Sequence, residues 1–329
     1  MAGKFRRARL LLWIGIAVAA LLLLNDAPGF HPGQSAPKPS VNAAARPPAS
    51  DAAVSSKPAA LLPQGRIECR SLASHLLHRA VPYCVFLPPA YLARPRRHFP
   101  VVYFFHGLGG NEQELVTSNA WELIEHLWRR RRMPQFILVA PDGWNSFFIN
   151  SIHRRFRWAD FFRRELMPAI ARQYRVLPGR RHRALTGISM GGYGALRMAF
   201  AHPGGFAAVA VNSPALMRHP PADRVNDPRL KLRLRFFGRV FGWPPQPAFW
   251  RRNSPLVLAR HARLAGMQIY FDCGAQDGFG FYRGAEALDR ELNRRHIPHQ
   301  FHLYPGGHNW FYFAAHLPAA LQFAGRAVQ

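Results

Sequence analysis

Two hydrophobic patterns alternate through most of the chain. Short uninterrupted apolar runs predict strands buried on both faces, and apolar positions three or four residues apart predict amphipathic helices. The predicted strands are 101–105, 136–140, 182–188, 207–212, 268–272 and 300–304, and the predicted helices are 122–132, 158–174, 193–202 and 283–295. Pro168 should kink or divide the helix at 158–174. Because strands alternate with helices, we expect an α/β fold, with a mainly parallel central sheet and helices on both faces.

A β-hairpin is predicted ahead of this sheet. Segments 67–72 and 83–87 have alternating apolar positions, and each carries one cysteine, Cys69 and Cys84. If the protein is exported, these two cysteines are expected to form a disulfide across the hairpin, which leaves Cys273 free.

The N-terminus has a third pattern. Basic residues precede an apolar run at 10–24, which Asn25 and Asp26 end. Residues 1–26 therefore predict a signal peptide or an uncleaved signal anchor. No clear small-residue cleavage site follows, which favours the anchor and membrane association through this segment. The positive-inside rule places the rest of the chain outside the cytoplasm, for example in the periplasm.

The remaining chain is predicted to have two parts. Residues 27–65 are rich in Ala and Pro and lack hydrophobic periodicity, so we expect a disordered linker. Residues 66–329 are long enough for one α/β domain. An Arg-rich stretch at 229–237 falls where a cap could be inserted. It could form a basic lid or a surface helix with a solvated cationic face, and we favour the surface helix.

The charge balance is strongly basic. Lys and Arg number 44 against 17 Asp and Glu, for a formal net charge of +27. Such a bias favours anionic partners. The basic residues are spread along the chain, however, and no nucleic-acid-binding motif organises them, so we expect no nucleic-acid partner. A chain adapted to acid, with few carboxylates to protonate, would have the same balance.

A nucleophile motif lies at the end of the predicted strand 182–188. Gly187-Ile188-Ser189-Met190-Gly191 has the G-x-S-x-G pattern between a strand and a helix. Such an elbow exposes the serine oxygen, and the glycines allow strand and helix to approach closely. The helix N-terminus also directs the Met190 N–H towards a developing oxyanion. The alternative is a glycine-rich turn with a structural serine.

A second oxyanion donor is expected in the turn after strand 101–105. His106-Gly107-Leu108-Gly109-Gly110 would place the Leu108 N–H near Ser189. A plain glycine-rich loop is the alternative. We expect His106 to brace this loop and not to act as a base.

The general base is predicted to be His308, in the loop after strand 300–304. Two carboxylates compete to be its partner, Asp272 at the end of strand 268–272 and Asp277 in the loop that follows. We favour Asp277, because its Gly-flanked loop can bend towards the imidazole, and assign Asp272 a structural task. His296, His299 and His302 recur every third residue and are candidate metal ligands. Strand geometry would scatter them over both faces, so we expect no metal and no cofactor.

Four motifs together resemble one family. They are Gly-Ile-Ser-Met-Gly-Gly-Tyr-Gly-Ala-Leu (187–196), Pro-Asp-Gly-x-Asn-Ser (141–146), Asp-Cys-Gly-x-x-Asp (272–277) and Tyr-Pro-Gly-Gly-His-x-Trp (304–310). This set is similar to the esterase D-type "putative esterase" family, which includes S-formylglutathione hydrolases, feruloyl esterases and mycolyltransferases. The resemblance implies the α/β-hydrolase fold, a triad of Ser189, Asp277 and His308, and an oxyanion hole at Leu108 and Met190. It leaves the substrate open.

Three functions are compatible with these features. The first is a serine carboxylic-ester hydrolase that acts on a small-molecule, lipid or sugar ester through an acyl-enzyme. The second is an acyltransferase that passes the same acyl group to a sugar or lipid hydroxyl. The third is a non-catalytic protein that binds anionic envelope polymers, which a complete triad disfavours.

Overall fold

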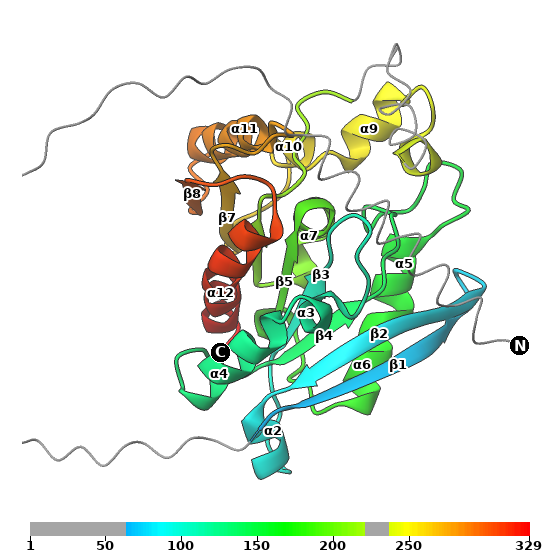
Figure 1. Cartoon of the computed structure of the whole chain (residues 1–329). Coiled ribbons are helices and arrows are strands. Elements are labelled where there is room, and N and C mark those ends of the chain that lie inside the picture. The colour runs from blue at the N-terminus through cyan, green and yellow to red at the C-terminus, as the bar shows by residue number, and fades with distance from the viewer. Residues whose placement is uncertain (1–63, 221–236) are drawn as a thin grey trace, which may run out of the picture. The chain divides into compact units, whose positions relative to one another are not determined.

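A central sheet of eight strands organises the computed structural model, which describes residues 64–220 and 237–329 (Figure 1). The strands are β1 (Arg66–Ser74), β2 (Arg79–Leu87), β3 (Val101–Phe105), β4 (Ile137–Pro141), β5 (Arg183–Ile188), β6 (Ala208–Asn212), β7 (Gln268–Gly274) and β8 (Gln300–Tyr304). Their order is β1-β2-β4-β3-β5-β6-β7-β8. Strands β3 to β8 are parallel, whereas β1 and β2 form an antiparallel hairpin against β4. The α/β-hydrolase architecture expected from the sequence is therefore present.

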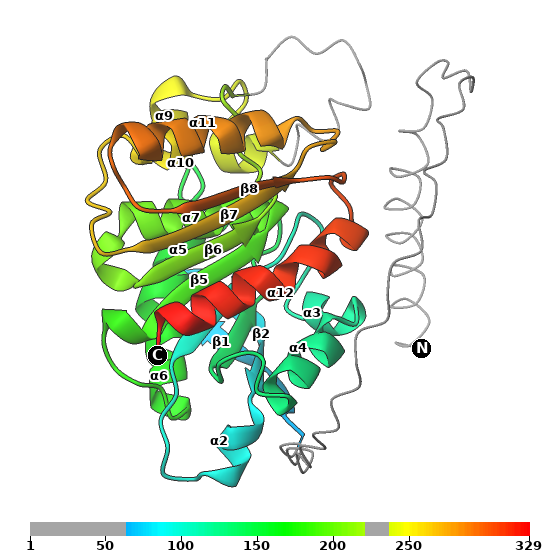
Figure 2. The same cartoon turned by 90° about the vertical axis from the view of Figure 1, so that its left-hand side faces the viewer.

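Helices cover both faces of the sheet. They are α2 (Pro89–Ala93), α3 (Glu114–Thr117), α4 (Ala120–Arg129), α5 (Trp158–Phe161), α6 (Met167–Gln173), α7 (Ser189–Ala201), α9 (Pro247–Asn253), α10 (Pro255–Leu258), α11 (Phe281–Arg294) and α12 (Trp310–Ala327), with a π-helix η1 (Phe162–Leu166) and short 3₁₀ turns η2 (Arg180–His182) and η3 (Pro203–Gly205). Figure 2 shows α12 lying across one face, with α3 and α4 beside it. The opposite face is covered by α5, α6, α7 and α11.

The alternation of side chains along each strand builds two cores. In β3, Tyr103 and Phe105 join the core beneath α5 and α7, whereas Val102 and Phe104 join the core beneath α4 and α12. Both faces of the strand are thus buried, which is why its sequence is an unbroken apolar run. These cores hold the carboxyl ends of the parallel strands, and the loops that follow them, in fixed positions.

Several helix boundaries differ from the predicted ones. The predicted helix 158–174 is three contiguous pieces, α5, η1 and α6. Pro168 lies in the first turn of α6, directly after the π-helix, in which the Met167 N–H bonds the Phe162 carbonyl five residues earlier. Helix α7 begins at Ser189 and not at residue 193. The long helix α12 was not predicted. Its apolar residues follow no clear single face, and Pro318 lies inside it.

The predicted hairpin disulfide is confirmed. Cys69 and Cys84 are directly paired in the register of β1 and β2, with Cα atoms 4.0 Å apart, and their sulfurs are bonded. Cys273 is free and buried.

Some predicted segments fall outside the described residues. They are the signal or anchor at 1–26, the linker except for its last two residues, and the Arg-rich stretch 229–237 except for Phe237. Within residues 64–220 and 237–329, no helix combines the length and the apolar character needed to cross a bilayer.

Candidate active site

Ser189 lies at a sharp turn between β5 and α7. Its φ is 53°, in the left-handed region, which costs a non-glycine residue about 1–3 kcal/mol and persists only where neighbouring structure holds it. One such contact is the Ala215 N–H, which donates to the Ser189 carbonyl at 2.9 Å. A Cβ on Gly191 would lie 1.9 Å from the Phe105 carbonyl oxygen, so only glycine lets α7 pack this closely on the end of β3. The predicted elbow is present.

His308 and Asp277 reach Ser189 from two other loops. The His308 Nε2 atom is 2.8 Å from Ser189 Oγ, and its Nδ1 atom is 2.7 Å from Asp277 Oδ2. His308 follows β8 and Asp277 follows β7, so three parallel strands deliver the three side chains to one edge of the sheet. The Asp277 side chain is fully buried and that of His308 is 10% exposed. The structure thus brings these three predicted residues into one hydrogen-bonded chain.

The two loops that carry His308 and Asp277 are tied together. The Gln276 N–H donates to the Gly306 carbonyl at 2.9 Å, and the Gly306 N–H donates to Gln276 Oε1 at 2.6 Å. The second carboxylate oxygen of Asp277 accepts the Phe279 N–H at 2.8 Å. These bonds fix the carboxylate relative to the imidazole before any ligand arrives.

Asp272 has different partners and does not contact His308. Its carboxylate is buried and accepts hydrogen bonds from Asn212 (2.7 Å), Tyr270 (3.0 Å) and Tyr312 (2.8 Å). Loss of hydration raises the pKa of Asp272 to about 6, although these hydrogen bonds favour the charged form. Asp272 therefore links β6, β7 and α12 beneath the site.

The two predicted oxyanion donors are the backbone N–H groups of Leu108 and Met190. The Gly107 N–H donates to Glu114 Oε2 and the Gly109 N–H to Asn145 Oδ1, at 2.8 and 2.9 Å. Leu108, between them, has no acceptor for its N–H among the residues that the structure describes. The Met190 N–H is in the first turn of α7, where backbone donors have no partner inside the helix.

His106 braces the loop that carries Leu108, as predicted. Its Nε2 atom accepts the Gly143 N–H at 2.8 Å, so Nδ1 carries the proton and donates to the Gly107 carbonyl, also at 2.8 Å. Both ring nitrogens are thereby occupied, and His106 is not available as a base. The ring joins the turn after β3 to the turn after β4.

Aromatic rings surround the imidazole of His308. Phe279, Phe281 and Phe313 meet it nearly edge-on, with ring centroids 5.1–5.3 Å away. They remove water from around the imidazole, which strengthens its hydrogen bonds. None of the three was singled out from the sequence.

Sequence reasoning also missed the residues that shape the oxyanion turn. Burial raises the pKa of Glu114, which accepts the Gly107 N–H seven residues earlier in the chain. Asn145 lies in the motif at 141–146, but its partner Gly109 is far away in sequence. Only the motif itself could have drawn attention to Asn145.

The histidines considered as metal ligands have other contacts. His299 Nε2 lies 3.0 Å from Asp289, and its ring stacks on Phe271. His302 stacks on Tyr304. Within residues 64–220 and 237–329, no group of three or more His, Cys, Asp or Glu side chains could hold a metal ion.

Comparison with solved structures supports the fold. A ferulic acid esterase is similar with a TM-score of 0.68, at 24% identity over 81% of this chain and 99% of that one. An S-formylglutathione hydrolase from Agrobacterium tumefaciens is similar with a TM-score of 0.63, at 18% identity over 81% of this chain and 96% of that one. These likenesses show the α/β-hydrolase fold.

Comparison of sequences shows the family. An esterase of Mycobacterium tuberculosis is 28% identical over 244 residues, which is 68% of this chain and 51% of the relative, so the chain spans about half the length of that protein. An acetyl esterase of Caldicellulosiruptor saccharolyticus is 24% identical over 68% of this chain and 83% of that one. The family described as "Putative esterase" matches residues 74–324. With that match over most of its length, the chain belongs to the putative esterase family.

Proposed function

We propose that the protein is a serine carboxylic-ester hydrolase that forms an acyl-enzyme at Ser189. The observation that carries this proposal is the hydrogen-bonded chain from Ser189 Oγ through His308 to Asp277, with contacts of 2.8 and 2.7 Å. Such a chain suits acyl transfer, because a serine hydroxyl needs a base to become nucleophilic and the base needs a partner to hold its tautomer. The membership of the esterase family supports the same reaction.

In the first half-reaction, Ser189 Oγ attacks the ester carbonyl carbon while His308 Nε2 takes the hydroxyl proton. Asp277 keeps the other proton on Nδ1 and stabilises the imidazolium that forms. The carbonyl oxygen becomes an oxyanion, which the Leu108 and Met190 N–H groups bind. As the C–O bond to the alcohol breaks, the imidazolium returns its proton to the leaving oxygen.

In the second half-reaction, water attacks the acyl-enzyme. His308 takes a proton from the water, the second oxyanion occupies the same pair of N–H groups, and the Ser189 ester bond breaks. The proton returns to Ser189 Oγ, and a free carboxylic acid leaves. The buried position of Asp277 and the aromatic rings around His308 keep bulk water out of the hydrogen bonds that drive both steps.

Replacement of the nucleophile tests this proposal. Ser189→Ala should lower kcat on p-nitrophenyl esters of varied chain length by on the order of 10⁶-fold, as in other triads. Ser71→Ala, at an exposed position on β1, is the matched control and should keep wild-type rates. A folded Ser189→Ala protein with wild-type rates on every ester would remove the enzyme proposal. Free acid released in step with the alcohol would distinguish hydrolysis from transfer to a sugar or lipid hydroxyl.

We also propose that the enzyme works outside the cytoplasm, held at the membrane by residues 1–26. The basic and apolar pattern of that segment supports export. The disulfide between Cys69 and Cys84 supports it independently, because such bonds persist in oxidising compartments.

A further inference from the structure

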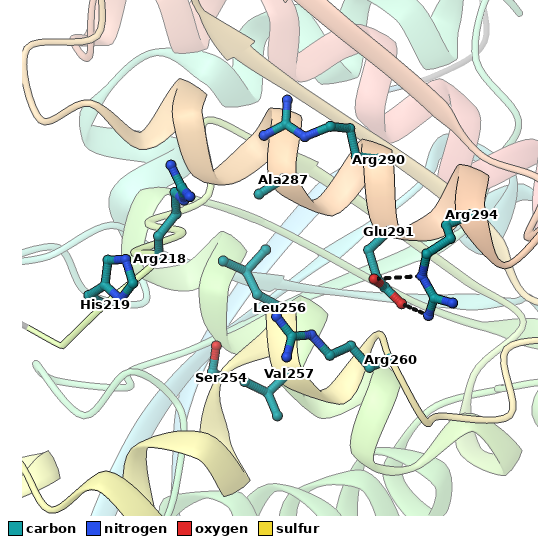
Figure 3. A pocket seen from close by; sticks show the side chains of 10 residues that line it. All are labelled: Arg218, His219, Ser254, Leu256, Val257, Arg260, Ala287, Arg290, Glu291 and Arg294. Atoms are coloured by element: carbon teal, nitrogen blue, oxygen red, sulfur yellow. Dashed lines mark hydrogen bonds and ion pairs between the residues drawn. The ribbon is translucent and has the colours of Figure 1, made fainter.

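A cationic pocket lies between α10 and α11, outside the Ser189 site. Its volume is about 360 Å³, within the range of pockets for small molecules. The residues that line it are Arg218, His219, Ser254, Leu256, Val257, Arg260, Ala287, Arg290, Glu291 and Arg294 (Figure 3). Four arginines against one glutamate leave this wall with a formal charge of +3, with His219 neutral.

Part of this positive charge has no close counter-ion. Glu291 forms an ion pair with Arg294, with contacts of 2.6 and 3.2 Å, and it also lies within electrostatic range of Arg260. Arg290 forms a long ion pair with Glu286, at 4.0 Å, whereas Arg218 and Arg260 form no side-chain hydrogen bond or close ion pair with any residue that the structure describes. Like charges held together repel one another, and a bound anion would relieve that repulsion.

The inner part of the pocket is chemically different from its rim. Leu256, Val257 and Ala287 supply apolar surface, and Ser254, which is 2% exposed, directs its hydroxyl into the pocket (Figure 3). That hydroxyl has no hydrogen-bond partner within residues 64–220 and 237–329. A mixture of apolar surface and one hydroxyl suits a sugar ring, which presents both C–H faces and hydroxyls.

The pocket shares two segments with the Ser189 site. The loop after β6 first bonds the Ser189 carbonyl through Ala215 and then packs Leu216 against Gly284 of α11 before it supplies Arg218. Helix α11 begins at Phe281, against the His308 ring. From there Arg290 is about 13 Å further along the helix axis. The two sites are separate but adjacent.

We propose that this pocket binds the phosphate or carboxylate group of a sugar-sized anionic ligand. The guanidinium groups of Arg218, Arg260 and Arg290 would bind the oxyanion, since their planar donor arrays match phosphate and carboxylate oxygens. The apolar surface and the Ser254 hydroxyl would contact the ring. A sugar phosphate and a uronic acid share this chemistry, and the pocket is too small to take a folded partner or a nucleic-acid helix.

Binding to the full chain tests this assignment, with glucose 6-phosphate, glucuronate and uncharged glucose as probes. Titration calorimetry or ligand-detected NMR should show saturable binding of one or both anions, weaker at raised ionic strength, and much weaker binding of glucose. Binding of only glucose 6-phosphate, or of only glucuronate, would then identify which anionic group the pocket prefers. No saturable binding at about 10 mM of either anion, or equal binding of glucose, would overturn the proposal.

Paired variants show whether any binding belongs to this pocket. Arg260→Gln with Arg290→Gln should weaken anion binding at least roughly tenfold, because each charged hydrogen bond lost is worth about that factor. Arg251→Gln with Arg252→Gln, which removes two exposed arginines of α9 outside the pocket, is the control and should leave the affinity unchanged. Equal losses in both pairs, with thermal midpoints like the wild type, would mean that general positive charge and not this pocket binds the anion.

Discussion

Asp277 and Asp272 lie five residues apart in the chain, yet their surroundings give them different chemistry. Asp277 contacts His308 Nδ1 at 2.7 Å, and its other oxygen accepts a backbone N–H. Asp272 accepts only from neighbouring donors beneath the site and does not contact the imidazole. Their positions relative to strand β7 do not by themselves show which of the two aspartates faces the imidazole. The direction of each carboxylate depends on the loop that follows, and Gly274 permits the turn because a Cβ there would lie 2.3 Å from the Gly306 oxygen.

Exchange of each carboxylate for an amide separates their roles. Asp277→Asn should lower kcat by up to about 10⁴-fold, because the amide N–H₂ favours the wrong imidazole tautomer. Asp272→Asn should have a much smaller effect on kcat. Both are measured on the same p-nitrophenyl ester, with circular dichroism as the check of folding. The assignment is reversed if a folded Asp272→Asn protein shows the large loss and Asp277→Asn is near wild type.

The raised pKa of Asp272 should make the free energy of unfolding depend on pH. Burial raises this pKa from 3.8 in the unfolded chain to about 6 in the folded protein, so the folded state binds the proton more tightly. The associated stability is present in full below about pH 4 and is lost as the pH rises through about 6. Relative to wild type, Asp272→Asn should therefore gain unfolding free energy by up to about 1.4 kcal/mol per pH unit across that window. Urea denaturation at a series of pH values measures the difference, and a difference that stays constant with pH would contradict the raised pKa.

At the scale of elements, one disulfide connects the two strands of the hairpin β1–β2. The chain closed by Cys69 and Cys84 spans 15 residues, and closing a loop of that length stabilises the fold by roughly 3 kcal/mol in the chain-entropy model. Cys69→Ser with Cys84→Ser should lower the unfolding free energy by about that amount in non-reducing denaturation. Wild-type protein treated with reductant should match the double variant. A double variant as stable as the oxidised wild type would show that the link contributes nothing.

The sequence predicted strands more completely than helices, for a physical reason. Strands β3 to β7 are buried on both faces, so their positions follow from unbroken apolar runs. Helix α12 lies against the sheet with apolar residues on several sides and contains Pro318, so its periodicity is weak. The start of α7 at Ser189 was also missed, because Gly191 and Gly192 lower helix propensity and are there for close packing.

From the sequence, only those residues of the candidate site that belong to a recognisable motif could be predicted. Ser189, Asp277, His308 and the Leu108 turn were found, because residue type and place after a strand point to them. Asn145 and Phe279 were missed because their partners, Gly109 and His308, are distant in sequence. Glu114 was missed because nothing in the sequence pattern indicates that its side chain folds back to the Gly107 N–H. The cationic pocket was missed because its lining residues come from separate segments of the chain. Its arginines come from the loop after β6, from α11 and from the region that follows α10.

For the whole molecule, we predict an enzyme that is held at the membrane outside the cytoplasm. Cell fractionation should recover the protein with membranes, and protease cleavage in the linker at 27–65 should release an active domain. The apolar run at 10–24 would hold the chain if it is not cleaved. A mature N-terminus near Ala27 or Pro28 would show instead that the segment is a signal peptide.

The central claim is that Ser189 is the covalent nucleophile of the whole protein. A fluorophosphonate reacts with a serine that a histidine has activated, and peptide mapping by mass spectrometry identifies the labelled residue. We expect a single adduct on the peptide that contains Ser189. It should be absent in Ser189→Ala, and it should form much more slowly in His308→Ala. Ser71→Ala should be labelled like the wild type. An adduct on another serine, or undiminished labelling of Ser189→Ala, would contradict the account.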